Sequence, residues 1–354
     1  MKRANLYVFI VVMVFSLSEV SWGQKGIFFL EVGNRKVMDY KFDEAVMNFN
    51  KAIELNPEFT EAYFNRGCAY LELGYYGYAI QDFSKAIELD PEDASAYVNR
   101  GNAYIEMCDF KSALTDFNRA IDLQPDDADA LYNRGLAYDG MKQYNFAIDD
   151  FKKVLKLNPD YASAYSGLAE IYGKTGKFDL AISNMTKSIS LNPEDADSYI
   201  KRAGYYREVK KSAGSLQDFN EAIKFNPENP NAYLGRATVY NELGMYDKAV
   251  EDLDFALGLN PELAAAFCER GYSFFYMKQY EKSLADLNRY IELNTKSPVA
   301  YKYRGLIYYN AGQFQEAVTD LRKAVYLSPT LSFELGSKIT AANEKLVLVA
   351  ASKK

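Results

Sequence analysis

Residues 94–127, ASAYVNRGNAYIEMCDFKSALTDFNRAIDLQPDD, are followed by residues 128–161, ADALYNRGLAYDGMKQYNFAIDDFKKVLKLNPDY, which repeat the same pattern. Both stretches have Arg-Gly at positions 7 and 8, Ala-Tyr at positions 10 and 11, and proline at position 32. Proline recurs with this spacing of 34 at residues 57, 91, 193, 227, 261 and 329, and Thr295 stands where one more is due. The period predicts nine tandem units that begin at residues 26, 60, 94, 128, 162, 196, 230, 264 and 298.

Each unit carries two amphipathic patterns. The first has a large apolar residue at position 4, Gly or Ala at position 8, and Tyr or Phe at position 11 in eight units of nine. The second has a small residue at position 20, a bulky one at 24 and a mostly small one at 27. Spacings of four and three put each set on one face of a helix. We therefore expect two helices in each unit, packed closely through their small residues, with proline ending the second helix.

This pattern resembles the tetratricopeptide repeat family over residues 24–331. The resemblance implies an all-α fold, a right-handed α-solenoid superhelix of nine 34-residue helix-turn-helix repeats. It also implies that the first helices line a concave groove that holds peptides, through positions 2, 5, 6, 9, 12 and 13. Residues 332–354 are expected to form a capping helix and tail, because one apolar stripe runs through Leu335, Ile339, Ala342, Leu346 and Val349.

The N-terminus has the three parts of a secretory signal peptide over residues 1–23. A basic start precedes an apolar run from Leu6 to Leu17, and the small residues Ser21 and Gly23 precede a cleavage point at Gln24. We expect the protein to be exported to a periplasm, an extracellular space or a secretory lumen. An uncleaved signal anchor and a buried helix are the alternatives, and the protein would bind a membrane only if the signal stays uncleaved.

The composition excludes several kinds of chemistry. The 354 residues include no histidine, which excludes Ser–His–Asp and Cys–His catalysis and histidine-containing zinc sites. Three cysteines (Cys68, Cys108 and Cys268) are too few for a four-cysteine metal site, and an odd number leaves at least one unpaired or intermolecular. A net charge of −7 argues against nucleic-acid binding. We expect no catalytic residue, cofactor or metal.

Positions 7 and 23 vary together. Seven units have arginine at position 7, and the same seven have aspartate at position 23. The two exceptions coincide, since Val32 accompanies Asn48 and Leu168 accompanies Asn184. An anion-binding stripe is one interpretation of the arginines. The shared exceptions favour an ion pair between helices, within one repeat or across neighbouring repeats.

Asparagine occupies the groove position 6 in three successive units, as Asn65, Asn99 and Asn133. The pattern is similar to the asparagine ladder with which the O-GlcNAc transferase superhelix grips a peptide main chain. Amides suit that task because they both donate and accept hydrogen bonds. The alternative is that the three side chains are simply solvated.

Two further sets of groove positions differ in chemistry. Lys174, Lys201 and Arg207 predict an anchor for an acidic peptide segment or a terminal carboxylate, or else a solvated patch offset by Glu170 and Glu208. In the same units Gly167, Gly173, Gly176 and Gly204 are expected to loosen the first helices. Near the C-terminal end, a set of aromatic residues predicts a peptide-binding wall, unless the tail helix covers them: Tyr272, Phe275, Tyr276, Tyr303 and Tyr309.

These patterns favour an exported, non-catalytic scaffold that binds peptides or extended protein segments in its concave groove. The alternative is an extracytoplasmic, holdase-like chaperone that binds many unfolded clients weakly. An enzyme is disfavoured because repeats occupy nearly the whole chain and histidine is absent. The partner and the oligomeric state stay open.

Overall fold

A computed structural model describes residues 22–351, which contain 19 α-helices, one short 3-10 helix and no strand. The predicted all-α fold of consecutive helix pairs is confirmed. Most of the predicted signal peptide, residues 1–21, lies outside the described residues, and the predicted cleavage point at Gln24 falls in the first turn of α1 (Trp22–Met38). Among the described helices, none has both the length and the apolar character needed to cross a membrane.

The chain divides into two units at Gly167 and Leu168, and α9 (Ala162–Lys174) crosses this division. The first unit also contains α1, α2 (Phe42–Leu55), α3 (Thr60–Glu72), α4 (Tyr76–Leu89), α5 (Ala94–Glu106), α6 (Phe110–Leu123), α7 (Ala128–Gly140) and α8 (Tyr144–Leu157). The second unit contains α10 (Phe178–Leu191), α11 (Ala196–Glu208), α12 (Ser212–Phe225), α13 (Pro230–Glu242), α14 (Tyr246–Leu259), α15 (Ala264–Tyr276), α16 (Tyr280–Leu293), α17 (Pro298–Asn310), α18 (Phe314–Leu327), η1 (Pro329–Leu331) and α19 (Ser332–Ala351).

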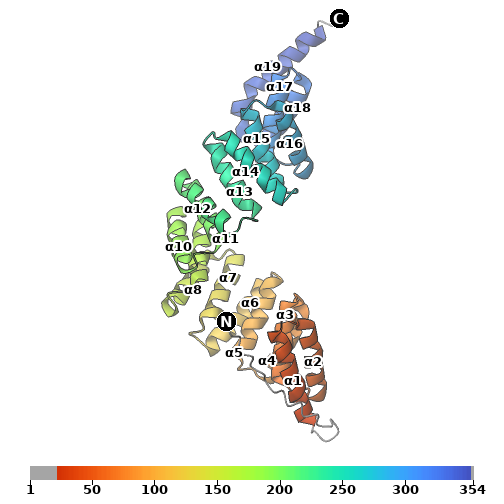
Figure 1. The fold of residues 1–354 in the computed structure, drawn as a ribbon, viewed down its shortest axis with the longest axis vertical. Coiled ribbons are helices and arrows are strands. Elements are labelled where there is room, and N and C mark those ends of the chain that lie inside the picture. Colours follow the sequence, from red (N-terminus) through yellow and green to blue (C-terminus); the bar gives the residue numbers. More distant parts are fainter. Residues whose placement is uncertain (1–21, 352–354) are drawn as a thin grey trace, which may run out of the picture. The chain divides into compact units, whose positions relative to one another are not determined.

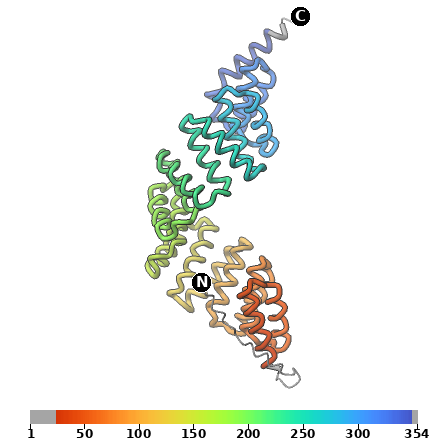
Figure 2. Tube along the Cα trace, viewed as in Figure 1, coloured from red at the N-terminus to blue at the C-terminus, as the bar shows by residue number. Residues whose placement is uncertain are grey.

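Within each unit a helix packs mainly on the helices that precede and follow it in the chain (Figure 1). The Cα trace of each unit is a succession of antiparallel helices joined by short turns (Figure 2). From α3 to α17, the first helix of each pair begins at the residue where the sequence period starts a unit. The prolines at position 32 lie in the turns that follow the second helices, where a helix cannot continue.

The core of each pair depends on the side chains at positions 8 and 24. In the first unit four phenylalanines at position 24 are at most 1% exposed: Phe49, Phe83, Phe117 and Phe151. Each packs on a glycine at position 8, and a Cβ on Gly101 would lie 2.7 Å from the ring of Phe117. Glycine is therefore needed there for close approach of the first helix to the ring.

The first helix of every pair ends in a left-handed residue at position 15. Four of these residues are glycines with φ of 73° to 77°: Gly74, Gly176, Gly244 and Gly312. Five are not glycine and have φ of 56° to 59°: Tyr40, Cys108, Lys142, Lys210 and Lys278. The next amide then bonds back into the helix, as Met245 N donates to Tyr240 O at 2.8 Å. This closing turn satisfies carbonyls at the helix end and sets the direction of the second helix.

The last helix, α19, caps the array as predicted. Leu335 and Ala342 are fully buried. Leu335 forms a core cluster with Leu321 and Ala324 of α18, and Ile339 packs against that cluster. Leu346 is half-buried, and the side chain of Val349 lies outside the described ones. The apolar stripe thus covers the end of the core, as a terminal repeat requires.

Candidate functional site

The seven arginines at position 7 form ion pairs with the aspartates at position 23 of the same repeat, as predicted. In each pair, Nε and one Nη donate to the two carboxylate oxygens at 2.6–2.9 Å. The aspartates are 2–7% exposed. Hydrogen bonding to Asp150 raises the pKa of Arg134, and burial opposes that effect. Bidentate pairs of this kind hold both side chains in one geometry. The pairs are Arg66–Asp82, Arg100–Asp116, Arg134–Asp150, Arg202–Asp218, Arg236–Asp252, Arg270–Asp286 and Arg304–Asp320.

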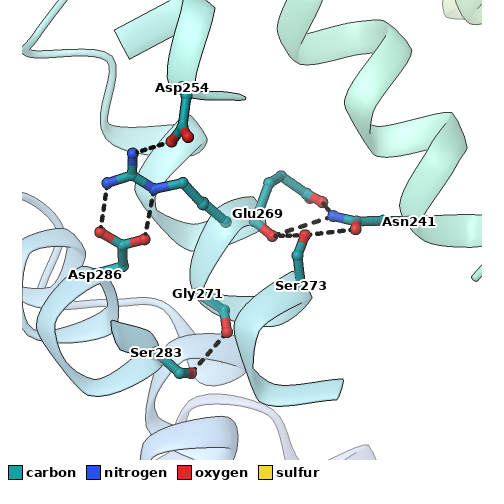
Figure 3. A network of polar contacts seen from close by, with 8 residues as sticks. Asn241, Asp254, Glu269, Gly271, Ser273, Ser283 and Asp286 are labelled. Carbon is teal, nitrogen blue, oxygen red and sulfur yellow. Dashed lines mark hydrogen bonds and ion pairs between the residues drawn. The ribbon is translucent and has the colours of Figure 1, made fainter. Parts of the chain in front are cut away.

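Each of these arginines also reaches the preceding repeat, which the sequence analysis missed. Its other Nη donates to an oxygen at position 25 of that repeat at 2.6–3.0 Å; the acceptors are Asn50, Ser84, Asn118, Thr186, Asn220, Asp254 and Asn288. Figure 3 shows one example, in which Asp254 and Asp286 bind the same guanidinium. We call this three-helix contact the arginine clamp. Because the clamp engages Nε and both Nη atoms of each arginine, we interpret these arginines as structural and not as an anion-binding stripe.

The three predicted asparagines have different surroundings. Asn65 Nδ2 donates to Oδ1 of Asn34 in the preceding repeat at 2.8 Å. Asn99 Nδ2 instead donates to Ser95 O within its own helix at 2.9 Å. All three, including Asn133, are half-buried. The structure therefore links Asn65 to a neighbouring repeat, whereas the predicted role of the whole ladder in peptide binding stays a prediction.

Two hollows share Val37, Met38 and Cys68, and Asn65 borders the first of them. One is about 270 Å³ and the other about 360 Å³. Asn34 and Asn65 complete the lining of the first, and Tyr40, Phe42, Ala69 and Glu72 that of the second. We call the two together the N-terminal hollow. Most of its lining comes from positions 6, 9, 12 and 13 of α1 and α3, which the family places on the groove side.

A third hollow, of about 470 Å³, lies beside the turn between α3 and α4. Its lining includes Tyr75, Tyr76, Tyr78 and Met107. Tyr75 is 52% exposed and Tyr78 is 59% exposed. No role was predicted for this aromatic surface, although three tyrosines within four residues, at positions 75, 76 and 78, are evident in the sequence.

Two of the predicted cations, Lys201 and Arg207, already have carboxylate partners. Lys201 Nζ lies 2.6 Å from Glu170 Oε1, and Arg207 lies 3.8 Å from Glu208 and 3.7 Å from Glu242. Lys174 is exposed at the end of α9. Of the two predicted alternatives, these ion pairs favour a solvated patch whose positive charges are offset by neighbouring carboxylates.

For Gly167 and Gly173 the expected loosening was wrong, because each lies directly against an aromatic ring, whereas for Gly204 it stays a prediction. A Cβ on Gly167 would lie 2.8 Å from the ring of Phe151. One on Gly173 would lie 2.4 Å from the ring of Tyr205. Both glycines instead permit close packing of a ring against the helix backbone.

Three of the four predicted tyrosines lie together. Tyr272, Tyr276 and Tyr303 have ring centroids 4.7–6.1 Å apart. Tyr303 is 7% exposed, and Tyr276 is 45% exposed. Tyr309 instead contacts Phe314, with Lys338 and Lys345 of α19 over its ring, so the tail helix covers it in part.

The partly buried thiols of Cys68 and Cys268 are not activated nucleophiles. Burial raises the pKa of Cys68 and of Cys268 to about 12. Nearby Glu72 and Asp93 act in the same direction on Cys68, and Glu269 does so on Cys268. Both thiols are therefore protonated near neutral pH, the form in which a thiol is a poor nucleophile.

Comparisons with known proteins identify the repeats and the fold. Tetratricopeptide repeat models match residues 94–127, 128–161, 162–195, 219–251 and 298–331, and a TPR repeat model matches residues 41–74 and 69–107. No curated protein sequence matches the chain. A tetratricopeptide repeat protein from Parabacteroides merdae has a similar crystal structure, with 22% identity and a TM-score of 0.57 over 71% of this chain and 100% of that one.

Two other crystal structures are also similar. The Cut9–Hcn1 hetero-tetramer of the APC/C has 16% identity and a TM-score of 0.58, over 90% of this chain and 76% of that one. MamA has 28% identity and a TM-score of 0.43, over 47% of this chain and 97% of that one. The family models together match more than half of the chain, and the helix pairs follow the same period. The chain belongs to the tetratricopeptide repeat family.

Proposed function

We propose that this protein is an exported, non-catalytic scaffold that binds an extended peptide segment along its first helices. The observation that carries the proposal is the N-terminal hollow. There an amide pair, Asn34 and Asn65, borders an apolar cavity lined by Val37 and Met38. An extended segment needs main-chain hydrogen-bond partners and a pocket for alternate side chains, and this hollow offers both.

Export is the part of the proposal that rests on sequence alone. A basic start, an apolar run and two small residues before Gln24 support a cleaved signal peptide. The partner would then be met in a periplasm, an extracellular space or a secretory lumen.

An acidic stretch in the ligand, bound near Lys174, Lys201 and Arg207, stays a prediction. A ligand carboxylate would compete with Glu170 for Lys201 and with Glu242 for Arg207. Because exposed ion pairs are weak, such competition is feasible, but it leaves little net attraction for the ligand.

The second candidate function is the holdase-like chaperone. The exposed aromatic hollow beside Tyr75 and Tyr78 favours it, since large exposed apolar patches commonly mark interaction sites. A holdase would accept many unrelated sequences, whereas a scaffold would select one. The same experiment therefore distinguishes the two functions.

The experiment selects linear peptides from a random display library against the chain that begins at Gln24. We expect the selected peptides to share a sequence pattern. Met38→Glu should weaken their binding at least about tenfold, because it puts a charge into the apolar hollow. Asn65→Ala should weaken binding by roughly two- to tenfold, the loss of one hydrogen bond. Fluorescence polarisation measures both, and mass spectrometry of the exported protein checks that it begins at Gln24.

Met47→Glu is the matched control. Met47 is 61% exposed on α2 and does not line the hollow, whereas Met38 is 78% exposed and does. Both changes add the same charge to an exposed methionine, so neither should unfold the protein. Equal effects of the two changes would exclude the hollow as the binding site, and selected peptides without a common pattern would favour the chaperone.

A further inference from the structure

Four tyrosines of the second unit form one connected group of rings. Tyr246 of α14 stacks on Tyr276 of α15, with ring centroids 5.1 Å apart and planes inclined by 6°. Tyr272 lies 4.7 Å from Tyr276 and stands perpendicular to Tyr303 of α17 at 5.1 Å. We call these four residues the tyrosine cluster. Tyr276 is 45% exposed, so a ligand can reach the cluster from solvent.

A half-buried carboxylate lies one helical turn from this cluster. Glu269 precedes Tyr272 on α15, and its Oε2 accepts a hydrogen bond from Asn241 Nδ2 at 2.9 Å (Figure 3). Asn241 is held in turn by Ser273, whose hydroxyl donates to Asn241 Oδ1 at 2.6 Å. Burial raises the pKa of Glu269, whereas the Asn241 hydrogen bond and the charge of Arg207 lower it. The polar network therefore fixes this carboxylate beside the rings.

Carboxylates act on the tyrosine cluster from both ends. Arg207, the nearest cation to act on Glu269, also lies 3.7 Å from Glu242 and 3.8 Å from Glu208. At the other end, Lys302 is bound at 2.6 Å by Glu334. Burial raises the pKa of Tyr272 and of Tyr303, and the charges of Glu269 and Glu334, respectively, act in the same direction, so the surroundings of the rings favour a positive charge.

One cation already occupies such a position within the chain. Lys302 Nζ lies over the ring of Tyr303, 5.2 Å from its centroid, while Glu334 binds the same ammonium group. The side chain of Lys302 is 16% exposed. A ring face and a carboxylate together are thus sufficient here to hold a lysine largely out of solvent, as expected for a cation–π contact.

We propose that the tyrosine cluster, with Glu269 and Glu242, binds a lysine or arginine side chain of the partner segment. This rests on the proposed function, because the cation belongs to a segment bound along the first helices. The carboxylates attract the charge, and the tyrosine rings contact it through their negative faces. The ligand of this end of the chain is therefore basic.

The test compares two labelled glycine–serine peptides that differ in one respect: one carries two arginines and the other two citrullines. Citrulline has the shape of arginine without its charge. We expect the arginine peptide to bind the full chain at least about tenfold more tightly, by fluorescence polarisation at low salt. Glu269→Gln and Tyr276→Leu should each reduce this preference several-fold. Glutamine keeps an oxygen that can accept from Asn241, and Tyr276 is exposed, so both variants should stay folded.

Tyr326→Leu is the matched control, since Tyr326 is 78% exposed on α18 and does not belong to the cluster. It should leave the preference for arginine unchanged. Equal binding of the arginine and citrulline peptides overturns the inference, as does a preference that survives both cluster variants. The proposed function fails separately, if library-selected peptides do not respond to Met38→Glu.

Discussion

At the scale of single residues, the arginine clamp connects three consecutive helices through one guanidinium. Arg134 of α7 binds Asp150 of α8 through two hydrogen bonds and Asn118 of α6 through a third. The side chains of Arg134 and Asp150 are 14% and 3% exposed. A charge in such surroundings is costly without its partner, and this asymmetry makes the clamp testable.

Asp150→Ala should lower the free energy of unfolding by about 3 kcal/mol, because it leaves Arg134 unpaired at a poorly hydrated interface. Asn118→Ala should cost only about 1 kcal/mol, since it removes a single hydrogen bond. The double change Arg134→Leu with Asp150→Asn reproduces the residues found naturally at Leu168 and Asn184, and it should cost much less than Asp150→Ala. Urea unfolding measures all three variants. If the single changes at Arg134 and Asp150 simply add in a double-mutant cycle, the two residues do not act as a pair.

At the scale of elements, the turn between the two helices of a pair depends on one left-handed residue. Lys210 has φ of 58° where Gly244 has φ of 73°. A side chain in this region costs roughly 1–2 kcal/mol, and glycine avoids that cost while it loses more entropy on folding. The five turns without glycine are therefore points of stored strain.

Lys210→Gly should raise the free energy of unfolding by roughly 0.5–1 kcal/mol, whereas Gly244→Ala should lower it by about 1 kcal/mol. Gly204→Ala is the matched control. A Cβ would meet no atom within 4 Å at either Gly204 or Gly244, but Gly204 lies inside α11 with an ordinary φ. Alanine should therefore stabilise at Gly204 by about 1 kcal/mol through helix propensity. Thermal and urea unfolding measure whether each substitution raises or lowers the free energy of unfolding. A change in the same direction for Gly244→Ala and Gly204→Ala would refute the argument from φ.

At the scale of the whole molecule, the repeat period made most of the fold predictable. A fixed spacing of small and large residues defines both helices of a repeat. Where a ring packs on a glycine, as Phe117 does on Gly101, few other residue types fit at either position. The arginine–aspartate pairs were predictable for the same reason, since two residue types recur together. The acceptors at position 25 were not predicted, because the residue type at that position varies among Asn, Ser, Thr and Asp. Each of these side chains nevertheless has an oxygen that can accept the hydrogen bond.

The candidate sites were less predictable than the fold. The sequence identified Tyr272, Tyr276 and Tyr303, but it gave no reason to associate them with Glu269 or to separate them from Tyr309. It left open whether Lys201 binds a ligand or is offset by Glu170, and the contact between these two residues of neighbouring repeats decides for Glu170. Contacts between groove side chains of different repeats follow no period, so they appear only when the helices are placed.

The division of the chain into two units has a consequence for unfolding. In a repeat array, interactions are mainly between neighbours, so cooperativity falls where those interactions are interrupted. The arginine clamp is absent from the repeat that has Leu168 and Asn184, and the division between the units falls at Leu168. We expect each unit to unfold with its own urea midpoint, which departs from two-state behaviour.

Pulse-labelling hydrogen exchange with mass spectrometry measures the two midpoints in the intact chain. Asp116→Ala should lower the midpoint of peptides from the first unit, because it unpairs Arg100, and it should leave the second unit nearly unchanged. Asp218→Ala should do the reverse by unpairing Arg202. The two changes remove the same contact from equivalent positions, so each is the control for the other. If all peptides share one midpoint and both variants shift it equally, the chain is a single cooperative array, and loss of the clamp at Leu168 does not interrupt the coupling.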